Sequence, residues 1–296
     1  MSAPAVIIRA AGSGAAPALP ASPVSDAYAR LTAAFPSFRV TELDPGGPLP
    51  ADGDWVPADG LAADGAALDA YLEWNGEQVL RDHGRQARPD VVATFGLHRY
   101  AWPACLLFTV PWFLHRRVPR LPVADVSFHR SQGRMAVRSA GTFACLPDDP
   151  AAALPGARVV AGEEELRAEL RAAVAEHLAP LLDAFGPRMR RRGRALWGSA
   201  TDEIVEGLWY AGHLLGEEQR AMRELGQLLP GATAPYSMGA AFRELAAPDG
   251  RALRTRDRAS CCLYYTLSPQ NTCVTCPRTC DTERVERLSA SAGAGD

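Results

Sequence analysis

The sequence has no lysine: all 31 basic residues among its 296 are arginines. We attribute this to GC-rich coding, which also explains the many alanines, glycines and prolines, and we infer no chemistry from it. Against 34 acidic residues the formal net charge is only −3, so the chain as a whole does not attract nucleic acid or anionic lipid. We therefore expect no nucleic-acid partner, and any electrostatic attraction must come from local patches.

Long uninterrupted apolar runs are also missing, although 47% of the residues are hydrophobic, which is enough for a large core. The longest run, residues 91–114, is interrupted by His98, Arg99, Pro103 and Pro111. A bilayer-spanning helix needs about 20 mostly uncharged residues, so we expect a buried helix with a kinked end and leave peripheral membrane contact open. The N-terminal residues lack the charged start and apolar stretch of an export signal, which favours a cytoplasmic location.

Sequence motifs for nucleotide cofactors and for hydrolysis are absent as well. The GSGAA sequence at Gly12 does not follow a predicted strand, and no dinucleotide-binding fingerprint occurs elsewhere. His98, His115 and His129 stand alone, without the spacing of metal ligands, and no catalytic triad or carboxylate pair can be argued from the sequence. A redox protein with this sequence would need electrons from a separate donor.

The residue patterns that are present predict an α+β fold. Residues 21–160 are expected to form a mixed N-terminal domain with short antiparallel strands, and residues 161–288 a helical domain that ends in a cysteine segment at 260–280. Small residues dominate 1–20 and 289–296, which we expect to be a disordered leader and tail. Apolar periodicity predicts strands at 38–43, 123–129, 135–139, 142–146 and 157–160 and helices at 25–34, 66–82, 163–185, 195–215 and 217–229.

Five of the seven cysteines lie near the C-terminus, and four of these form two pairs: Cys261 with Cys262, and Cys273 with Cys276. Disulfides are not expected in a reducing cytoplasm, and soft thiolates favour zinc or an iron–sulfur cluster. The adjacent pair does not suit a single zinc ion, because neighbouring side chains of an extended chain leave on opposite sides and paired zinc ligands normally stand further apart. A binuclear cluster relaxes this constraint, so the sequence favours [2Fe–2S] over structural zinc.

The order Cys-Cys, ten residues, Cys-x-x-Cys near the end of a chain of this size resembles the siderophore ferric-reductase (FhuF-like) family. The resemblance implies a [2Fe–2S] cluster on Cys261, Cys262, Cys273 and Cys276, with no catalytic residue beyond it. It also implies an oxidoreductase acting on metal ions, which reduces Fe(III) in a hydroxamate-type siderophore by one electron and releases Fe(II). The donor would be a separate ferredoxin or flavin reductase. Outside this segment the resemblance is general and identifies no substrate-binding residue.

Other features near this segment each have a structural and a functional interpretation. The basic run Arg188, Arg190, Arg191, Arg192 and Arg194 is by default a solvated loop, or else a docking patch for an acidic electron donor. The second run, Arg251, Arg254, Arg256 and Arg258, could attract anionic partners or raise the cluster potential. The expected roles of the remaining side chains are packing for Trp197, Trp209, Tyr210 and His213, shielding or substrate contact for Tyr264 and Tyr265, burial for Cys105 and Cys145, and a surface position for Cys280.

Three alternatives to a reductase stay open: an iron–sulfur electron carrier, a redox sensor that acts on DNA, and a zinc-stapled binding protein. A carrier seldom needs a body of this size, and a sensor would want a basic helix-turn-helix. For a reductase we expect an exposed cluster beside a shallow cleft, because a ferric chelate is too bulky for a narrow pocket.

Overall fold

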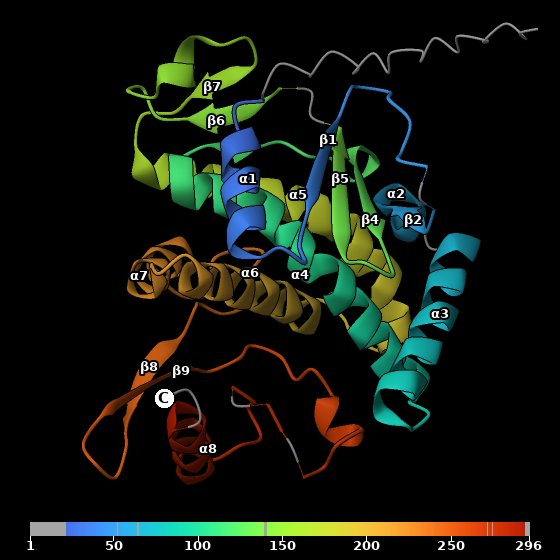
Figure 1. The fold of residues 1–296 in the computed structure, drawn as a ribbon, viewed down its shortest axis with the longest axis vertical. Coiled ribbons are helices and arrows are strands. Elements are labelled where there is room, and N and C mark those ends of the chain that lie inside the picture. Colours follow the sequence, from blue (N-terminus) through green and yellow to red (C-terminus); the bar gives the residue numbers. More distant parts are fainter. Residues whose placement is uncertain are drawn as a thin grey trace, which may run out of the picture.

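The computed structural model describes residues 22–293 except 52, 64, 139, 140, 271 and 274. Its centre is a layer of three long helices (Figure 1): α4 (Pro89–His115), α5 (Glu163–Met189) and α6 (Arg194–Leu214). α4 packs against both α5 and α6. Small sheets and shorter helices surround this layer, so the predicted α+β class is confirmed. The leader expected at 1–20 lies outside the described residues.

Helix α4 is buried on nearly every side. It is covered by α1 (Ser25–Ala34), α3 (Ala66–His83), α5 and α6, which explains why its sequence is apolar all round and not on one face only. Pro103 and Pro111 both lie within the helix, and Arg116, in the left-handed conformation, ends it. The predicted buried helix is thus confirmed. Among the described helices, none has the length and apolar character needed to cross a bilayer.

Short strands form two small sheets beside the helices. Their bounds are β1 (Val40–Leu43), β2 (Trp55–Pro57), β3 (Val118–Pro119), β4 (Val126–His129), β5 (Arg134–Arg138), β6 (Phe143–Cys145) and β7 (Ala157–Val159). The first sheet has the order β1–β5–β4–β2 and the second β3–β6–β7. The β2–β4, β4–β5 and β3–β6 pairs are antiparallel as expected, whereas β1–β5 and β6–β7 are parallel. In both parallel pairs a longer connection carries the chain back to the end at which the first strand started, so the second strand runs in the same direction.

The junction between α5 and α6 differs from the prediction. We expected Gly186 and Pro187 to end the first helix, but α5 continues to Met189 and ends where Arg190 turns left-handed. Gly186 serves packing instead, since a Cβ there would lie only 2.9 Å from a methyl group of Leu196 at the start of α6. The two helices therefore approach closely where the basic loop joins them.

Two elements after α7 (Glu218–Leu228) were not predicted. The hairpin of β8 (Phe242–Ala246) and β9 (Ala252–Arg256) leads into the cysteine segment, and α8 (Asp281–Gly293) follows it. Residues 289–293 of the expected disordered tail are thus helical, and 294–296 lie outside the described residues. The division into two domains at 160 stays a prediction, and one hydrophobic core contains buried residues from both sides of it.

Candidate metal centre

The cysteine segment leaves β9 and runs along α6, on the side away from the small sheets (Figure 1). Cys261, Cys262 and Cys273 line one cavity of about 200 Å³. Cys276 is only 2% exposed. Burial raises the pKa of Cys261, and the hydrogen bond with Cys262 raises the pKa of Cys273. The charge of the nearby Cys276 adds a smaller increase to both. Three of the four predicted ligands therefore share one cavity, and the assignment of all four as ligands stays a prediction.

The donor set fits a binuclear iron–sulfur cluster. Cys262 Sγ and Cys273 Sγ lie 4.0 Å apart, and two sulfurs bound to one tetrahedral metal at about 2.3 Å lie about 3.8 Å from each other. A [2Fe–2S] cluster takes two protein ligands on each iron. Cys262 and Cys273 would suit one iron and leave Cys261 and Cys276 for the other. Within the described residues, no group of three or more His, Cys, Asp or Glu side chains is placed so that it could hold a metal ion.

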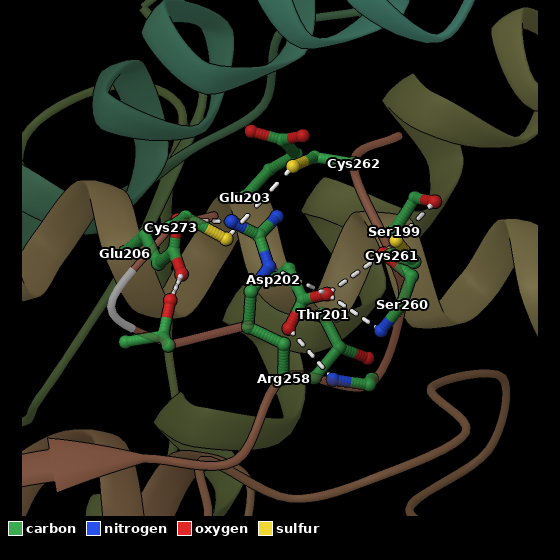
Figure 2. A network of polar contacts seen from close by, with 12 residues as sticks. Ser199, Thr201, Asp202, Glu203, Glu206, Arg258, Ser260, Cys261, Cys262 and Cys273 are labelled. Carbon is green, nitrogen blue, oxygen red and sulfur yellow. Dashed lines mark hydrogen bonds and ion pairs between the residues drawn. The ribbon is translucent and has the colours of Figure 1, made fainter. Parts of the chain in front are cut away.

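The backbone just before the first cysteine pair is held by Asp202 of α6 (Figure 2). The Asp202 carboxylate accepts hydrogen bonds from the N–H groups of Ala259 and Ser260, at 2.9 and 2.8 Å, and from the Ser260 hydroxyl at 2.8 Å. It also pairs with Arg256 at 2.8 Å, and both side chains are fully buried. Gly198 lets this backbone come close, because a Cβ there would lie 3.2 Å from the Ala259 carbonyl oxygen.

One turn further along α6, Glu206 connects the two halves of the cysteine motif. It accepts hydrogen bonds from Arg256 and Arg258, at 3.2 and 2.9 Å, and from the Thr275 hydroxyl at 3.1 Å. Thr275 stands between Cys273 and Cys276. Because Asp202 and Glu206 are four residues apart, they project from the same face of the helix. This face therefore fixes the chain beside both cysteine pairs.

One of the four thiols, that of Cys262, is favoured as a thiolate by its surroundings. The hydrogen bond from Cys273 lowers the pKa of Cys262 to about 6, and Arg258 and His98 add to this effect. Figure 2 shows Arg258 reaching toward the Cys262 and Cys273 sulfurs. The Arg278 N–H points at Cys276 Sγ from 3.4 Å. A thiol that is already deprotonated near neutral pH is ready to bind a metal.

A histidine and a carboxylate form the rim of the cysteine cavity. His98 Nδ1 on α4 lies 2.7 Å from Glu203 Oε2 on α6, and the charge of Glu203 raises the pKa of His98. Sequence reasoning treated His98 as an isolated residue and did not consider Asp202, Glu203 or Glu206. The sequence feature that could have indicated these three carboxylates is their grouping on a helix that is otherwise mainly apolar.

Two residues of the second basic run, Arg256 and Arg258, do not have the first of the two roles expected for it. Arg256 is fully buried, and Arg258 is only 9% exposed at its side chain; both pair with Asp202 and Glu206. They are therefore not free to attract anionic partners. Their charges compensate the buried carboxylates of α6, and Arg258 still brings positive charge to the sulfurs.

The remaining predicted side chains are placed as follows. Tyr264 lines the cysteine cavity, which fits a shielding role, and Arg278 lies over the Tyr265 ring at 4.2 Å. Trp197 and Trp209 pack edge-on against Tyr236 and Phe242, as predicted. Tyr210 also packs, against Phe35 and Trp102, but it is 42% exposed. The predicted positions of three other cysteines are confirmed: Cys105 and Cys145 are buried and Cys280 is exposed.

A wider groove of about 720 Å³ adjoins the cysteine cavity. The two share Cys273, Arg258, Glu206 and His98 in their walls. A further hollow of about 350 Å³ continues the groove past His98. The half-buried Cys273 therefore lines both the cysteine cavity and the open groove.

These features fit a thiolate metal centre at the C-terminal end of a helical body. Residues 258–278 match the family model of the FhuF 2Fe-2S C-terminal domain, as the cysteine spacing predicted. No curated protein matches the chain significantly. The family match identifies a [2Fe–2S] cluster as the cofactor, and the matched residues include Arg258 and all four cysteines of the motif.

Replacing Asp202 with asparagine tests the support of this centre. Asp202→Asn removes the negative charge that the buried Arg256 faces at 2.8 Å. Loss of one charge from a buried ion pair costs about 3–5 kcal/mol. We expect a comparable drop in the free energy of unfolding of the metal-free protein, measured in denaturant, and a lower iron content after reconstitution. The exposed Asp183 on α5 provides the control: Asp183→Asn should change stability by less than about 0.5 kcal/mol. An Asp202→Asn variant with normal stability and iron content would contradict the assignment.

Proposed function

We propose that the protein is a ferric-siderophore reductase of the cytoplasm, which passes one electron to Fe(III) in a hydroxamate-type siderophore and releases Fe(II). Cys261, Cys262, Cys273 and Cys276 would hold the [2Fe–2S] cluster. The observation that carries the proposal is the position of Cys273, in the wall between the cysteine cavity and the open groove. The family match to residues 258–278 supports the same reaction class.

The chemistry requires little from acid–base residues. Hydroxamate oxygens are hard anionic donors that bind Fe(III) far more tightly than Fe(II), so one electron is enough to free the metal. The cluster supplies one-electron transfer when bound. The chain's own residues seat the chelate beside Cys273, and they keep positive charge at the sulfurs through Arg258, which favours the reduced state.

The electron donor should be a separate acidic protein, such as a ferredoxin, that docks on the loop between α5 and α6. Arg190 and Arg192 of this loop and Arg194, the first residue of α6, are exposed, and no ion pair of theirs occurs among the described residues. Arg191 turns inward and donates a hydrogen bond to the Cys261 carbonyl at 2.5 Å. The basic loop thus lies directly against the metal centre, where complementary charge would speed encounter with the donor.

Stoichiometric reoxidation tests the reductase. Anaerobic protein reduced with dithionite and freed of excess reductant is mixed with a ferric trihydroxamate complex and a chromogenic ferrous chelator. We expect the visible absorption of the oxidised protein to return as an equal amount of ferrous complex forms, because each chain gives up one electron. The Ga(III) complex of the same siderophore, which accepts no electron here, is the control. A reduced protein that no ferric chelate reoxidises would indicate an electron carrier or a redox sensor instead.

Charge reversal on the basic loop tests the donor. NADPH alone should leave the protein oxidised, whereas a reduced ferredoxin should reduce it at a rate that falls as ionic strength rises. Arg190→Glu/Arg192→Glu/Arg194→Glu should slow this reaction about tenfold or more at low salt.

The matched control for the basic loop carries the same change in net charge at other exposed arginines: Arg30→Glu/Arg39→Glu/Arg223→Glu. Stopped-flow rates that are equal in the two triple variants would mean that the donor docks elsewhere. Rapid reduction by NADPH alone would show that no separate donor is needed.

A further inference from the structure

We propose that the groove beside Cys273 is the chelate-binding site, and that it recognises an electrically neutral ferric complex by contact with the aromatic ring of Tyr210. The inference rests on the proposed reductase function and adds to it the residues of the substrate site and the charge that the site accepts.

An aromatic surface forms the floor of the groove. Phe35 follows α1, Trp102 belongs to α4 and Tyr210 to α6, and all three line the cavity. The Tyr210 ring lies 5.6 Å from that of Phe35, edge-on, and 5.8 Å from that of Trp102. Tyr210 is nevertheless 42% exposed. Phe35 and Trp102 are half-buried. Aromatic side chains gathered in a hollow are typical of ligand sites, which are lined mainly by apolar and aromatic residues.

The groove has the size and position that the substrate needs. Its volume of about 720 Å³ is within the range of small-molecule sites, about 300–1,000 Å³. A chelate seated on the aromatic floor would stand beside Cys273, which lines both the groove and the cysteine cavity. Electron transfer would therefore need no movement of the protein body.

Charge in the groove favours a neutral complex. Of the described residues that line it, Arg258 is positive, and Glu206 and Glu218 are negative. Arg258 already pairs with Glu206 at 2.9 Å. Glu218 has His213 at 3.4 Å and accepts a hydrogen bond from Trp209 at 2.9 Å. His98 lies against Glu203. Arg258 is thus matched by a carboxylate, and the described residues that line the groove include no other arginine.

The charge of the groove lining should distinguish ferric hydroxamate complexes from ferric catecholate complexes. Three hydroxamates carry three negative charges and cancel the charge of Fe(III), whereas three catecholates leave the complex with three negative charges. A trianion in this groove would find the nearby arginines already occupied, since Arg258 pairs with Glu206 at 2.9 Å and Arg254 lies 4.0 Å from Glu218. Without a free cation to receive it, its binding is disfavoured. A neutral complex with an organic shell meets no such penalty and can contact the aromatic floor.

Binding of gallium complexes to the oxidised holoprotein tests the site without electron transfer. Ga(III) has the charge of Fe(III) and is not reduced here, so calorimetry measures affinity alone. We expect the Ga(III) complex of a linear trihydroxamate to bind, and Tyr210→Ala to weaken it roughly tenfold, as for an aromatic anchor. Tyr210→Leu, which keeps apolar volume against Phe35 and Trp102, should weaken it as well. The exposed Leu154 on another surface provides the control, and Leu154→Ala should bind normally.

The outcomes distinguish this inference from the proposed function. Normal affinity in both Tyr210 variants, or absence of Ga(III) trihydroxamate binding by a protein that does reduce the ferric complex, would overturn the groove as the substrate site and leave the reductase intact. A Ga(III) tris-catecholate that binds as tightly as the trihydroxamate would overturn the charge argument. A protein that neither binds nor reduces any chelate would overturn the proposed function together with the site.

Discussion

The buried contact between Asp202 and the chain before Cys261 is the interaction on which the metal centre depends. A carboxylate with no exposed surface is costly unless its charge and hydrogen-bonding capacity are satisfied. Asp202 meets this condition with Arg256 and with the N–H groups of Ala259 and Ser260. The same bonds that make the buried charge tolerable therefore fix the backbone from which Cys261 and Cys262 project.

One rigid helix serves both parts of the site. Along α6, Asp202 and Glu206 hold the cysteine segment, and Glu203 lies against His98 at the cysteine cavity. Tyr210 lies about one turn beyond Glu206, in the groove. A site built on one helix keeps its geometry better than one built on loops, because the helix backbone is fully hydrogen-bonded. The distance between cluster and substrate would then be set by the helix and not by the cysteine segment, whose own secondary structure is sparse.

The sequence predicted the metal centre better than its surroundings. Cysteine spacing alone indicated a binuclear cluster, and apolar periodicity located the long helices to within a few residues. The groove could not be predicted, since Phe35, Trp102 and Tyr210 come from three elements that only tertiary packing brings together. Arg256 was misjudged for a related reason: a charged side chain in a basic run suggests solvent exposure, and only the buried carboxylates of α6 explain why it lies inside.

The most direct test of the central claim is elemental and spectroscopic analysis of the anaerobically purified protein. The account predicts iron and acid-labile sulfide in equal amounts, visible absorption that bleaches on reduction, and a paramagnetic signal in the reduced state. Serine in place of Cys273 or Cys276 should abolish the signal, whereas Cys280→Ser should retain it. A colourless protein with stoichiometric zinc, or loss of the cluster in Cys280→Ser alone, would contradict the account.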